Sequence, residues 1–538
     1  MSGPHAVRIG GGGGFYGDRL VAPVELLQTG DLDYLIIDYL AELTMSILAK
    51  QRSRDRHAGW ATDLMEWLGA GGIQELRERG TRLITNAGGA HPEACAKIVL
   101  ALAIESGWDD CKVGVIIGDD LMPYMSSLID SGARLNHMEV GDPITSVLDK
   151  LASANAYIGA GPIARALERG ADIVITGRVA DASLTVGPMV HEAGWAARAE
   201  ARGLPLCGPI DNWAPEADTA LDLIASWTIA GHLIECGAQV TGGNATDWNT
   251  QPNLGNLGYP VACVDVEGGV MITKPPESGG RLDRLAVAEQ LVYEIGDPSG
   301  YPTPDVLVDM RAIELDEVEG GVRMIGARGR VQPEKLKVSA SFSDGWFASS
   351  SLLVPGPDTL ARAQRLDETI RARLEAVGLD DLEVHTEYHG SGTTLPPGLE
   401  VEVFDPPEIL IRWAVRSPSR RQVVEFGREV APLVLTGPAG VAGYGARPRP
   451  RAQFRFWPAL IERSHVEPRI ALELLDSRLE DLPRPVLAQL RLWLGQVQSF
   501  IEHELAERLE RLQRNAPEGR TQRIATAVLD RLKGSERR

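Results

Sequence analysis

The chain has 538 residues, more than one ordinary hydrophobic core accommodates, so two or three domains are expected. Hydrophobic residues make up 44% and charged residues 24%, which is typical of globular proteins and excludes extensive disorder. The formal net charge of -20, from 74 acidic and 54 basic residues, repels polyanions and argues against a nucleic-acid partner.

The cysteines and the N-terminus bear on the cellular compartment. Five scattered cysteines without CxxC spacing indicate a reducing environment and no structural zinc. The first residues lack the basic start and apolar core of a signal peptide. No stretch reaches the ~18 apolar residues that suggest a membrane span. We therefore expect a cytoplasmic protein with no membrane partner.

The first 300 residues repeat one pattern, in which a short apolar run is followed by a polar loop and an amphipathic helix. The five clearest apolar runs, which we predict to be strands, are Val7–Ile9, Tyr34–Ile37, Arg82–Thr85, Lys112–Ile117 and Ala171–Ile175. Strands that alternate with helices favour a mostly parallel sheet with helices on both faces. Right-handed crossovers then place the polar loops at one edge of the sheet, where open α/β sheets bind ligands. Residues 1–300 are thus predicted to form an α/β domain.

The pattern changes near residue 301, and residues 301–450 are predicted to form a smaller α+β domain. A β-rich stretch over 305–357 precedes helices near 359–377 and 420–435, which bracket a strand over 409–415. Residues 451–538 are predicted to be a helical C-terminal extension. Its apolar residues recur every three or four positions from Leu487 to Leu512, the spacing of a long amphipathic helix. That helix docks either on its own chain or on a second subunit, and we expect a homo-oligomer.

Two of the polar loops have candidate binding chemistry. The run Gly10–Gly14 permits close backbone approach to a phosphate, although its spacing is not GxGxxG, and a flexible tight turn is the alternative. Asp119 and Asp120 close a strand predicted to be buried. Paired carboxylates suit a divalent ion such as Mg²⁺ or a base with a raised pKa, whereas the alternative is that one of them caps the next helix.

Arg178 and Asp181 follow another predicted buried strand. A guanidinium grips a carboxylate or phosphate in bidentate fashion, and an aspartate three residues on is within reach of the same ligand as a general base. The alternative is an internal Arg–Asp ion pair that locks the loop.

The remaining candidates are amides, one lysine and one cysteine. Asn86, Asn155 and Gln239 either hydrogen-bond to a thioester carbonyl or close their own loops. Lys274 either neutralises a phosphate or is a solvated loop lysine. Cys236 follows a predicted helix end, whose dipole raises a thiol pKa, so a structural cysteine is favoured over a nucleophile. Histidine spacing gives weak support for a metal site, and no GxSxG elbow is found.

Several loop motifs, taken together and in order, resemble the acyclic terpene utilisation (AtuA, or DUF1446) family over residues 7–445. They are Gly12–Arg19, Asp38–Thr44, Thr85–Gly89, Gly118–Asp120, Ala154–Tyr157, Thr176–Asp181, Glu235–Gly243 and Gly326–Gly329. The resemblance implies a role in the breakdown of acyclic terpenes such as citronellol and geraniol as coenzyme A thioesters. It further implies action late in that route, on a branched 3-hydroxyglutaryl-CoA intermediate.

We therefore predict a lyase or hydro-lyase that acts on a branched 3-hydroxyacyl-CoA, with coenzyme A as part of the substrate. In this prediction Asp181 or Asp119 is the base, Arg178 clamps a carboxylate, and Asn86 and Asn155 polarise the thioester. The residues expected to bind coenzyme A or substrate are Gly12, Gly13, Gly14, Tyr16, Asp18, Gln239 and Lys274. The alternatives are a metal-assisted hydrolase built on Asp119 and Asp120, and a non-catalytic subunit that binds an acyl-CoA.

Overall fold

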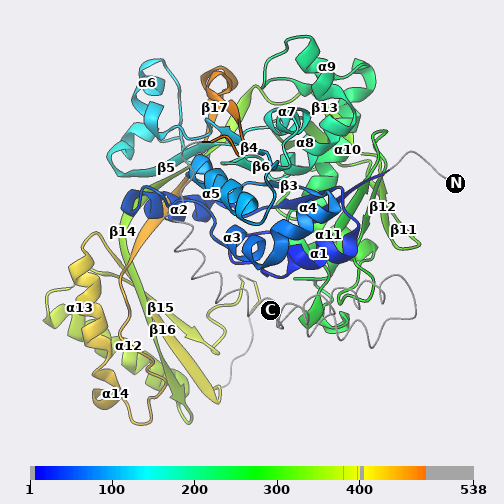
Figure 1. Cartoon of the computed structure of the whole chain (residues 1–538). Helices are drawn as coiled ribbons and strands as arrows, with labels where there is room; N and C mark the ends of the chain where they lie inside the picture. Colours follow the sequence, from blue (N-terminus) through cyan, green and yellow to red (C-terminus); the bar gives the residue numbers. More distant parts are fainter. Residues whose placement is uncertain (1–5, 380, 397, 400–404, 480–538) are drawn as a thin grey trace. The chain divides into compact units, whose positions relative to one another are not determined.

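The computed structural model describes residues 6–379, 381–396, 398–399 and 405–479 (Figure 1). The chain divides into two compact units. Unit 1 comprises the described residues of 1–146, 153–340 and 457–538, and unit 2 comprises residues 147–152 and 341–456.

Unit 1 is built on a ten-stranded sheet of order β11-β12-β8-β7-β1-β2-β3-β6-β4-β18. Its parallel centre consists of β1 (Val7–Gly11), β2 (Tyr34–Ile37), β3 (Arg82–Thr85), β6 (Ile173–Thr176) and β4 (Val113–Ile117). The flanking antiparallel strands are β7 (Val261–Val264), β8 (Val270–Thr273), β12 (Gly321–Ile325), β11 (Glu314–Val318) and β18 (Ala471–Leu475). Every residue of β2 and of β6 is buried, as expected of parallel strands covered on both faces. The predicted α/β class and its parallel strands are confirmed.

Helices cover both faces of this sheet (Figure 1). One face shares a single hydrophobic core with α1 (Ala22–Gly30), α2 (Glu42–Arg54), α3 (Asp63–Trp67), α4 (Ile73–Arg79) and α5 (Pro92–Glu105). The other face is contacted by α7 (Gly161–Glu168), α8 (Ser183–Glu192) and α10 (Ala217–Ile234). The remaining helices of unit 1 are α6 (Met125–Asp130), α9 (Trp195–Ala201) and α11 (Arg284–Val292). A separate three-stranded sheet has the order β13 (Arg328–Arg330), β10 (Leu307–Asp309), β9 (Tyr301–Pro302).

Unit 2 is an α+β unit whose sheet has the order β15 (Glu383–His389), β16 (Glu408–Ser417), β14 (Lys335–Pro355), β17 (Arg451–Glu462). Strands β14 and β17 run across the boundary between the units, as does β5 (Leu151–Ala156), which pairs with β14. Helices α12 (Thr359–Ala376), α13 (Arg420–Val430) and α14 (Leu433–Thr436) supply one side of the core. Leu366, Trp413 and Phe426 are fully buried there.

The boundary predicted at residue 301 lies instead at residue 341. Residues after 301 still belong to unit 1, because β11 and β12 extend the same sheet beyond the antiparallel strands β7 and β8.

The helical extension predicted from residue 451 is wrong for its first part, which forms β17 and β18. Ala459 and Ile461 are buried whereas Leu460 and Glu462 are exposed, which is strand periodicity. The predicted amphipathic helix from Leu487 to Leu512 lies outside the described residues.

Candidate functional site

The polar loops that follow the parallel strands meet at one edge of the sheet in unit 1. Asp38 follows β2, Asn86 follows β3, Asp119 follows β4, and Arg178 follows β6. All four side chains are buried, with exposures between 0% and 4%. Buried polar groups need partners, so the contacts among these loops define the site.

Asn86 binds Asp38 across the ends of β2 and β3. Its Nδ2 donates to Asp38 Oδ1 at 2.6 Å, and its Oδ1 accepts from the Tyr39 amide at 2.7 Å. Burial, reinforced by the negative charge of Asp181, holds the pKa of Asp38 well above its usual range. Asn86 is therefore a loop-closing amide that positions the Asp38 carboxyl. Of its two predicted roles, this is the one that the contacts match.

Asp119 gathers donors from two other loops. Its Oδ2 accepts from Asn155 Nδ2 at 2.8 Å and from the Arg178 amide at 2.8 Å. Burial raises the pKa of the Asp119 carboxyl to about 7, although both of these hydrogen bonds oppose the shift. Gly177 is required beside it, because a Cβ at that position would lie 2.3 Å from Asp119 Oδ1. Asn155 thus holds Asp119 in place.

Arg178 forms the internal ion pair that was the alternative to a substrate clamp. Its Nη1 donates to Asp181 Oδ1 at 2.6 Å and to the Val179 carbonyl at 3.0 Å. The guanidinium lies 4.0 Å from the centre of the Tyr157 ring, a cation–π contact. Arg178 is 2% exposed, whereas the Asp181 side chain is 34% exposed. Asp181 is therefore the member of this pair that solvent reaches.

Tyr157 connects the buried guanidinium to a second ion pair. Its hydroxyl donates to Glu42 Oε1 at 2.8 Å, and Lys337 Nζ contacts the same oxygen at 2.9 Å. Although burial acts in the opposite direction, the charge of Lys337 lowers the pKa of Glu42 to about 2. Positive and negative charge therefore alternate along this side of the site.

The end of α10 brings another acid to the same cluster, Glu235, whose side chain is 12% exposed. His232 Nδ1 lies 2.9 Å from Glu235 Oε1, and His232 Nε2 lies 3.2 Å from the Leu291 carbonyl oxygen. Burial raises the pKa of Glu235 to about 7, with the charge of Asp181 adding to the shift and that of His232 opposing it. Burial likewise raises the pKa of the Cys236 thiol to about 12, which argues against a thiolate nucleophile.

The glycine run packs against this helix end. A Cβ at Gly11 would lie 2.5 Å from the Ile234 carbonyl oxygen, and one at Gly14 would lie 2.8 Å from the Cys236 carbonyl carbon. The Gly14 amide donates to Asp18 Oδ2 at 2.9 Å, and those of Gly11 and Gly12 donate to backbone carbonyls. Close packing thus accounts for these glycines, and the binding of coenzyme A by Gly12, Gly13 and Gly14 stays a prediction.

Other predicted binding residues lie near this loop but have partners of their own. The Tyr16 hydroxyl pairs with Thr62 Oγ1 at 2.8 Å. Asp18 Oδ1 accepts from the Tyr259 hydroxyl at 2.5 Å. Gln239 lies in the 3₁₀ turn Gly237–Thr241 that follows α10.

Lys274 is half-buried and closes its own loop rather than facing solvent. Its Nζ donates to the Ser278 carbonyl at 2.8 Å, to Ser278 Oγ at 3.1 Å and to the Gly279 carbonyl at 3.2 Å. With its three donors engaged, the lysine is poorly placed to neutralise a phosphate.

The predicted metal pair Asp119 and Asp120 is not supported by the geometry. Asp120 Oδ1 caps the Met122 amide at 3.0 Å, and its other oxygen lies 3.5 Å from Arg52, whereas Asp119 binds Asn155 and Arg178. Within the part of the chain that the structure describes, no group of three or more His, Cys, Asp or Glu side chains is arranged to hold a metal ion. Asp120 therefore closes a local turn before the 3₁₀ helix Met122–Tyr124, whose N-cap is Leu121.

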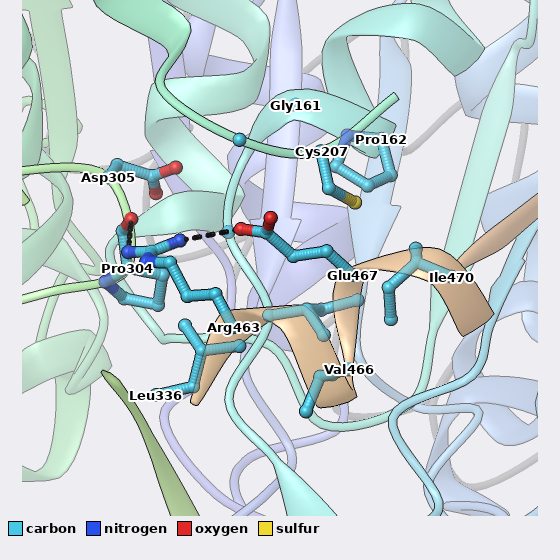
Figure 2. A pocket seen from close by; sticks show the side chains of 13 residues that line it. Gly161, Pro162, Cys207, Pro304, Asp305, Leu336, Arg463, Val466, Glu467 and Ile470 are labelled. Carbon is cyan, nitrogen blue, oxygen red and sulfur yellow. Dashed lines mark hydrogen bonds and ion pairs between the residues drawn. The ribbon is translucent and has the colours of Figure 1, made fainter. Parts of the chain in front are cut away.

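A small cavity lies next to this cluster, beside the residues that follow Tyr157 (Figure 2). Ile158, Leu336 and Cys207 line it, and Arg463 crosses it to reach the Pro304 carbonyl and Glu467, the latter at 3.0 Å. Its volume of about 20 Å³ holds a water molecule rather than a ligand. It is therefore not a substrate site.

The sequence analysis missed four residues of the cluster as candidates: Asp38, Glu42, Tyr157 and Glu235. Asp38 and Glu42 stand within a motif that follows the predicted strand Tyr34–Ile37, so their position was a usable signal. Glu235 gave a different one, because His232 and Glu235 have the i, i+3 spacing of neighbours on a helix. Their burial depends on distant segments and could not be read from spacing.

The fold and site define an α/β protein whose buried acids collect at the carboxyl edge of a parallel sheet, the usual ligand-binding edge of this class. Such clusters of buried acids with raised pKa values are typical of functional sites.

Comparison with known proteins then gives the family. A model of the acyclic terpene utilisation family protein AtuA matches residues 7–202 and 207–472, and the chain belongs to this family. No curated protein and no solved structure matches the chain significantly. Among the described residues, no helix combines the length and apolar character that a membrane crossing requires.

Proposed function

We propose that this protein is an enzyme that acts on a branched 3-hydroxyacyl-CoA, as a lyase or hydro-lyase. The family context of acyclic terpene utilisation supports a branched acyl substrate. Coenzyme A enters the proposal as part of that substrate, and the cytoplasm is the proposed compartment. The five cysteines are free, which agrees with a reducing environment.

One observation carries the proposal: the solvent-reachable carboxylate of Asp181 belongs to a cluster with three largely buried acids that have raised pKa values. Asp38, Asp119 and Glu235 are those acids, and burial is the first cause of the shift in each case. Acids that titrate near neutral pH are suited to both giving and taking protons. Where the environments of two such groups make their pKa values differ, one group can act as the acid and the other as the base.

The reaction needs a base at the substrate hydroxyl or at Cα, and Asp181 is the proposed base. Arg178 fixes its carboxylate at 2.6 Å, which replaces the earlier role of Arg178 as a substrate clamp. Arg178 Nε is buried and has no hydrogen-bond partner among the described residues, so it is a donor for a ligand oxygen beside Asp181. Asn86 and Asn155 support Asp38 and Asp119 rather than the thioester.

The test is a screen of the purified protein against branched and linear 3-hydroxyacyl-CoA thioesters, with products identified by mass spectrometry. Loss of water indicates a hydro-lyase, and loss of a carbon fragment indicates carbon–carbon cleavage. A protein that binds these thioesters but converts none of them would be the non-catalytic subunit instead.

A thermal shift with free coenzyme A is a simpler first measurement. Ligand at a hundredfold excess over its dissociation constant stabilises the folded state by about 2.7 kcal/mol. No shift with coenzyme A, together with no turnover, would refute the acyl-CoA substrate class.

A further inference from the structure

Glu235 differs from the other acids of the site in having a fully buried carboxylate oxygen without a hydrogen-bond partner among the described residues. Its Oε1 contacts His232 Nδ1 at 2.9 Å, but its Oε2 is fully buried and has no hydrogen-bond partner among the described residues. The Glu235 side chain is 12% exposed. A buried polar atom without a partner destabilises the folded state, so its retention calls for a reason.

The contacts of His232 determine where its protons lie. The Leu291 carbonyl can only accept a hydrogen bond, so His232 Nε2 carries a proton. The proton on Nδ1 is shared with Glu235 Oε1. When both nitrogens of His232 are protonated, the imidazolium lies against the Glu235 carboxylate and occupies its Oε1. Glu235 Oε2 is then the oxygen that remains to exchange a proton with another molecule.

Glu235 belongs electrostatically to the strand-end cluster and not only to α10. Its charge interacts with groups from the loops after β6 and α11, from β9 and from its own helix end. These groups are Asp181, Glu294, Tyr301, Cys236 and His232. The end of α10 also packs on the loop after β6, because a Cβ at Gly231 would lie 2.7 Å from the carbonyl oxygen of Ala182, the residue after Asp181. A substrate bound at Asp181 therefore lies near this helix end.

We propose that Glu235 is the second proton-transfer group of the site, donating through Oε2, and that His232 is the positioning residue that stabilises the carboxylate left behind. The inference rests on the proposed function. Burial, which raises the pKa of Glu235 to about 7, agrees with a group that is protonated in part at neutral pH.

Asp181 and Glu235 together account for every proton that moves in both candidate reactions. In dehydration, Asp181 takes the Cα proton, the C–O bond breaks, and Glu235 protonates the departing hydroxyl to give water and an enoyl thioester. In carbon–carbon cleavage, Asp181 takes the hydroxyl proton, a carbonyl forms, the Cα–Cβ bond breaks, and Glu235 protonates Cα. In each case Asp181 ends protonated and Glu235 ends ionised against His232, and both reset by proton exchange with solvent.

The first test needs no substrate. Ring-nitrogen NMR of the full-length protein follows the titration of His232, with H232N to identify its resonances. Glu235→Gln removes the negative partner, so we expect the pKa of His232 to fall by at least one unit. Glu168→Gln is the matched control, since it breaks another His–Glu contact of 3.1 Å, to His191, away from the cluster. An unchanged His232 titration in folded E235Q would overturn the pairing.

The second test uses the thioester identified in the screen. We expect E235Q to lower kcat by about 10²–10⁴-fold with a much smaller change in KM. His232→Gln should move the alkaline limb of the pH profile to higher pH, because Glu235 loses the positive charge that favours its ionised form. A purely structural role would leave that limb in place, as we expect for E168Q.

Full kcat in E235Q, or an unmoved limb in H232Q, would overturn the assignment of Glu235. If the wild-type protein converts no 3-hydroxyacyl thioester, the proposed function fails. The NMR titration would still decide whether His232 and Glu235 share a proton, so the two failures are distinguishable.

Discussion

The two edges of the parallel sheet handle polar side chains in opposite ways. At the amino edge, Tyr34 donates to Glu192 at 2.5 Å, and His191 contacts both Glu168 at 3.1 Å and Arg82 at 3.0 Å. Most of these groups are partly exposed, with His191 at 18% and Glu168 at 26%. Charges there meet partners close to solvent, which is the ordinary arrangement of a protein surface.

At the carboxyl edge, Asp38 and Asp119 are buried and are hydrogen-bonded by neutral groups. Asp38 and Asp119 are 4% and 2% exposed, and asparagine side chains or backbone amides hold them. This arrangement does not favour the stability of the fold. A buried carboxyl that is bound by neutral donors keeps its proton, so it does not gain the stabilisation that an ionised carboxylate has from a charged partner. The contrast teaches that the burial of Asp38 and Asp119 among neutral hydrogen-bond donors, more than the number of polar residues, distinguishes the carboxyl edge from the amino edge.

The largest expected effect is on catalysis. Asp181→Asn should lower kcat by about 10²–10⁴-fold, because the base is lost while the amide oxygen still accepts from Arg178. Glu192→Gln, at the amino edge, should leave kcat within a few-fold of the wild type. Steady-state kinetics with the identified thioester measure both, and equal losses in the two variants would remove the distinction between the edges.

Next in size is the stability of the two edges. Asp119→Ala leaves the Asn155 amide and the Arg178 backbone N–H without an acceptor, so the free energy of unfolding should fall by about 2–4 kcal/mol. Tyr34→Phe removes one hydrogen bond and should cost about 1 kcal/mol. Denaturant unfolding gives both values, and a larger loss in Y34F would reverse the comparison.

A smaller effect tests the packing of the glycine loop. Gly14→Ala places a Cβ 2.8 Å from the Cys236 carbonyl carbon and should destabilise the protein by about 1–3 kcal/mol. Gly296→Ala is the control, because its Cβ meets nothing within 4 Å. Equal melting temperatures for the two variants would show that the loop has room to move away from α10.

The pH dependence of stability should have opposite signs at the two edges. The pKa of Asp119 is raised from 3.8 to about 7, so its contribution is present below pH 4 and is lost as pH rises to about 7. Burial and the charge of Arg82 lower the pKa of His191 from 6.5, so its contribution is lost as pH falls below 6.5. Asp119→Asn and His191→Gln should each flatten their own part of the profile, measured by unfolding from pH 4 to 8. Slopes of the same sign would contradict the electrostatic contrast.

Much of the central sheet could be predicted from sequence because its strands are short apolar runs between polar loops. The limits of β2 and β3 coincide with the predicted ones, and Asn86, Asp119 and Arg178 converge as expected. Their side-chain roles were harder, since Arg178 turned inward to Asp181 and Asn86 to Asp38. Such choices depend on which neighbouring loop brings a partner within hydrogen-bond distance.

Other features depend on contacts between distant segments. The antiparallel strands β11 and β12 lie in the β-rich stretch that suggested a separate domain, yet they extend the central sheet. Strand β18 pairs with β4 although about 350 residues separate them, so sequence-local patterns give no indication of it. The burial of Glu235 likewise comes from segments far from α10 in the sequence.

The unpaired oxygen of Glu235 has a consequence for how this protein can change. Replacing Glu235 and its partner His232 together with apolar side chains of similar size would remove the unsatisfied oxygen without leaving His232 Nδ1 unpaired, so the fold should become more heat-resistant while turnover is abolished. Selection for thermal tolerance alone would then erode this pair first. Relatives that have lost the activity but kept the fold should be recognisable by hydrophobic residues at the end of α10.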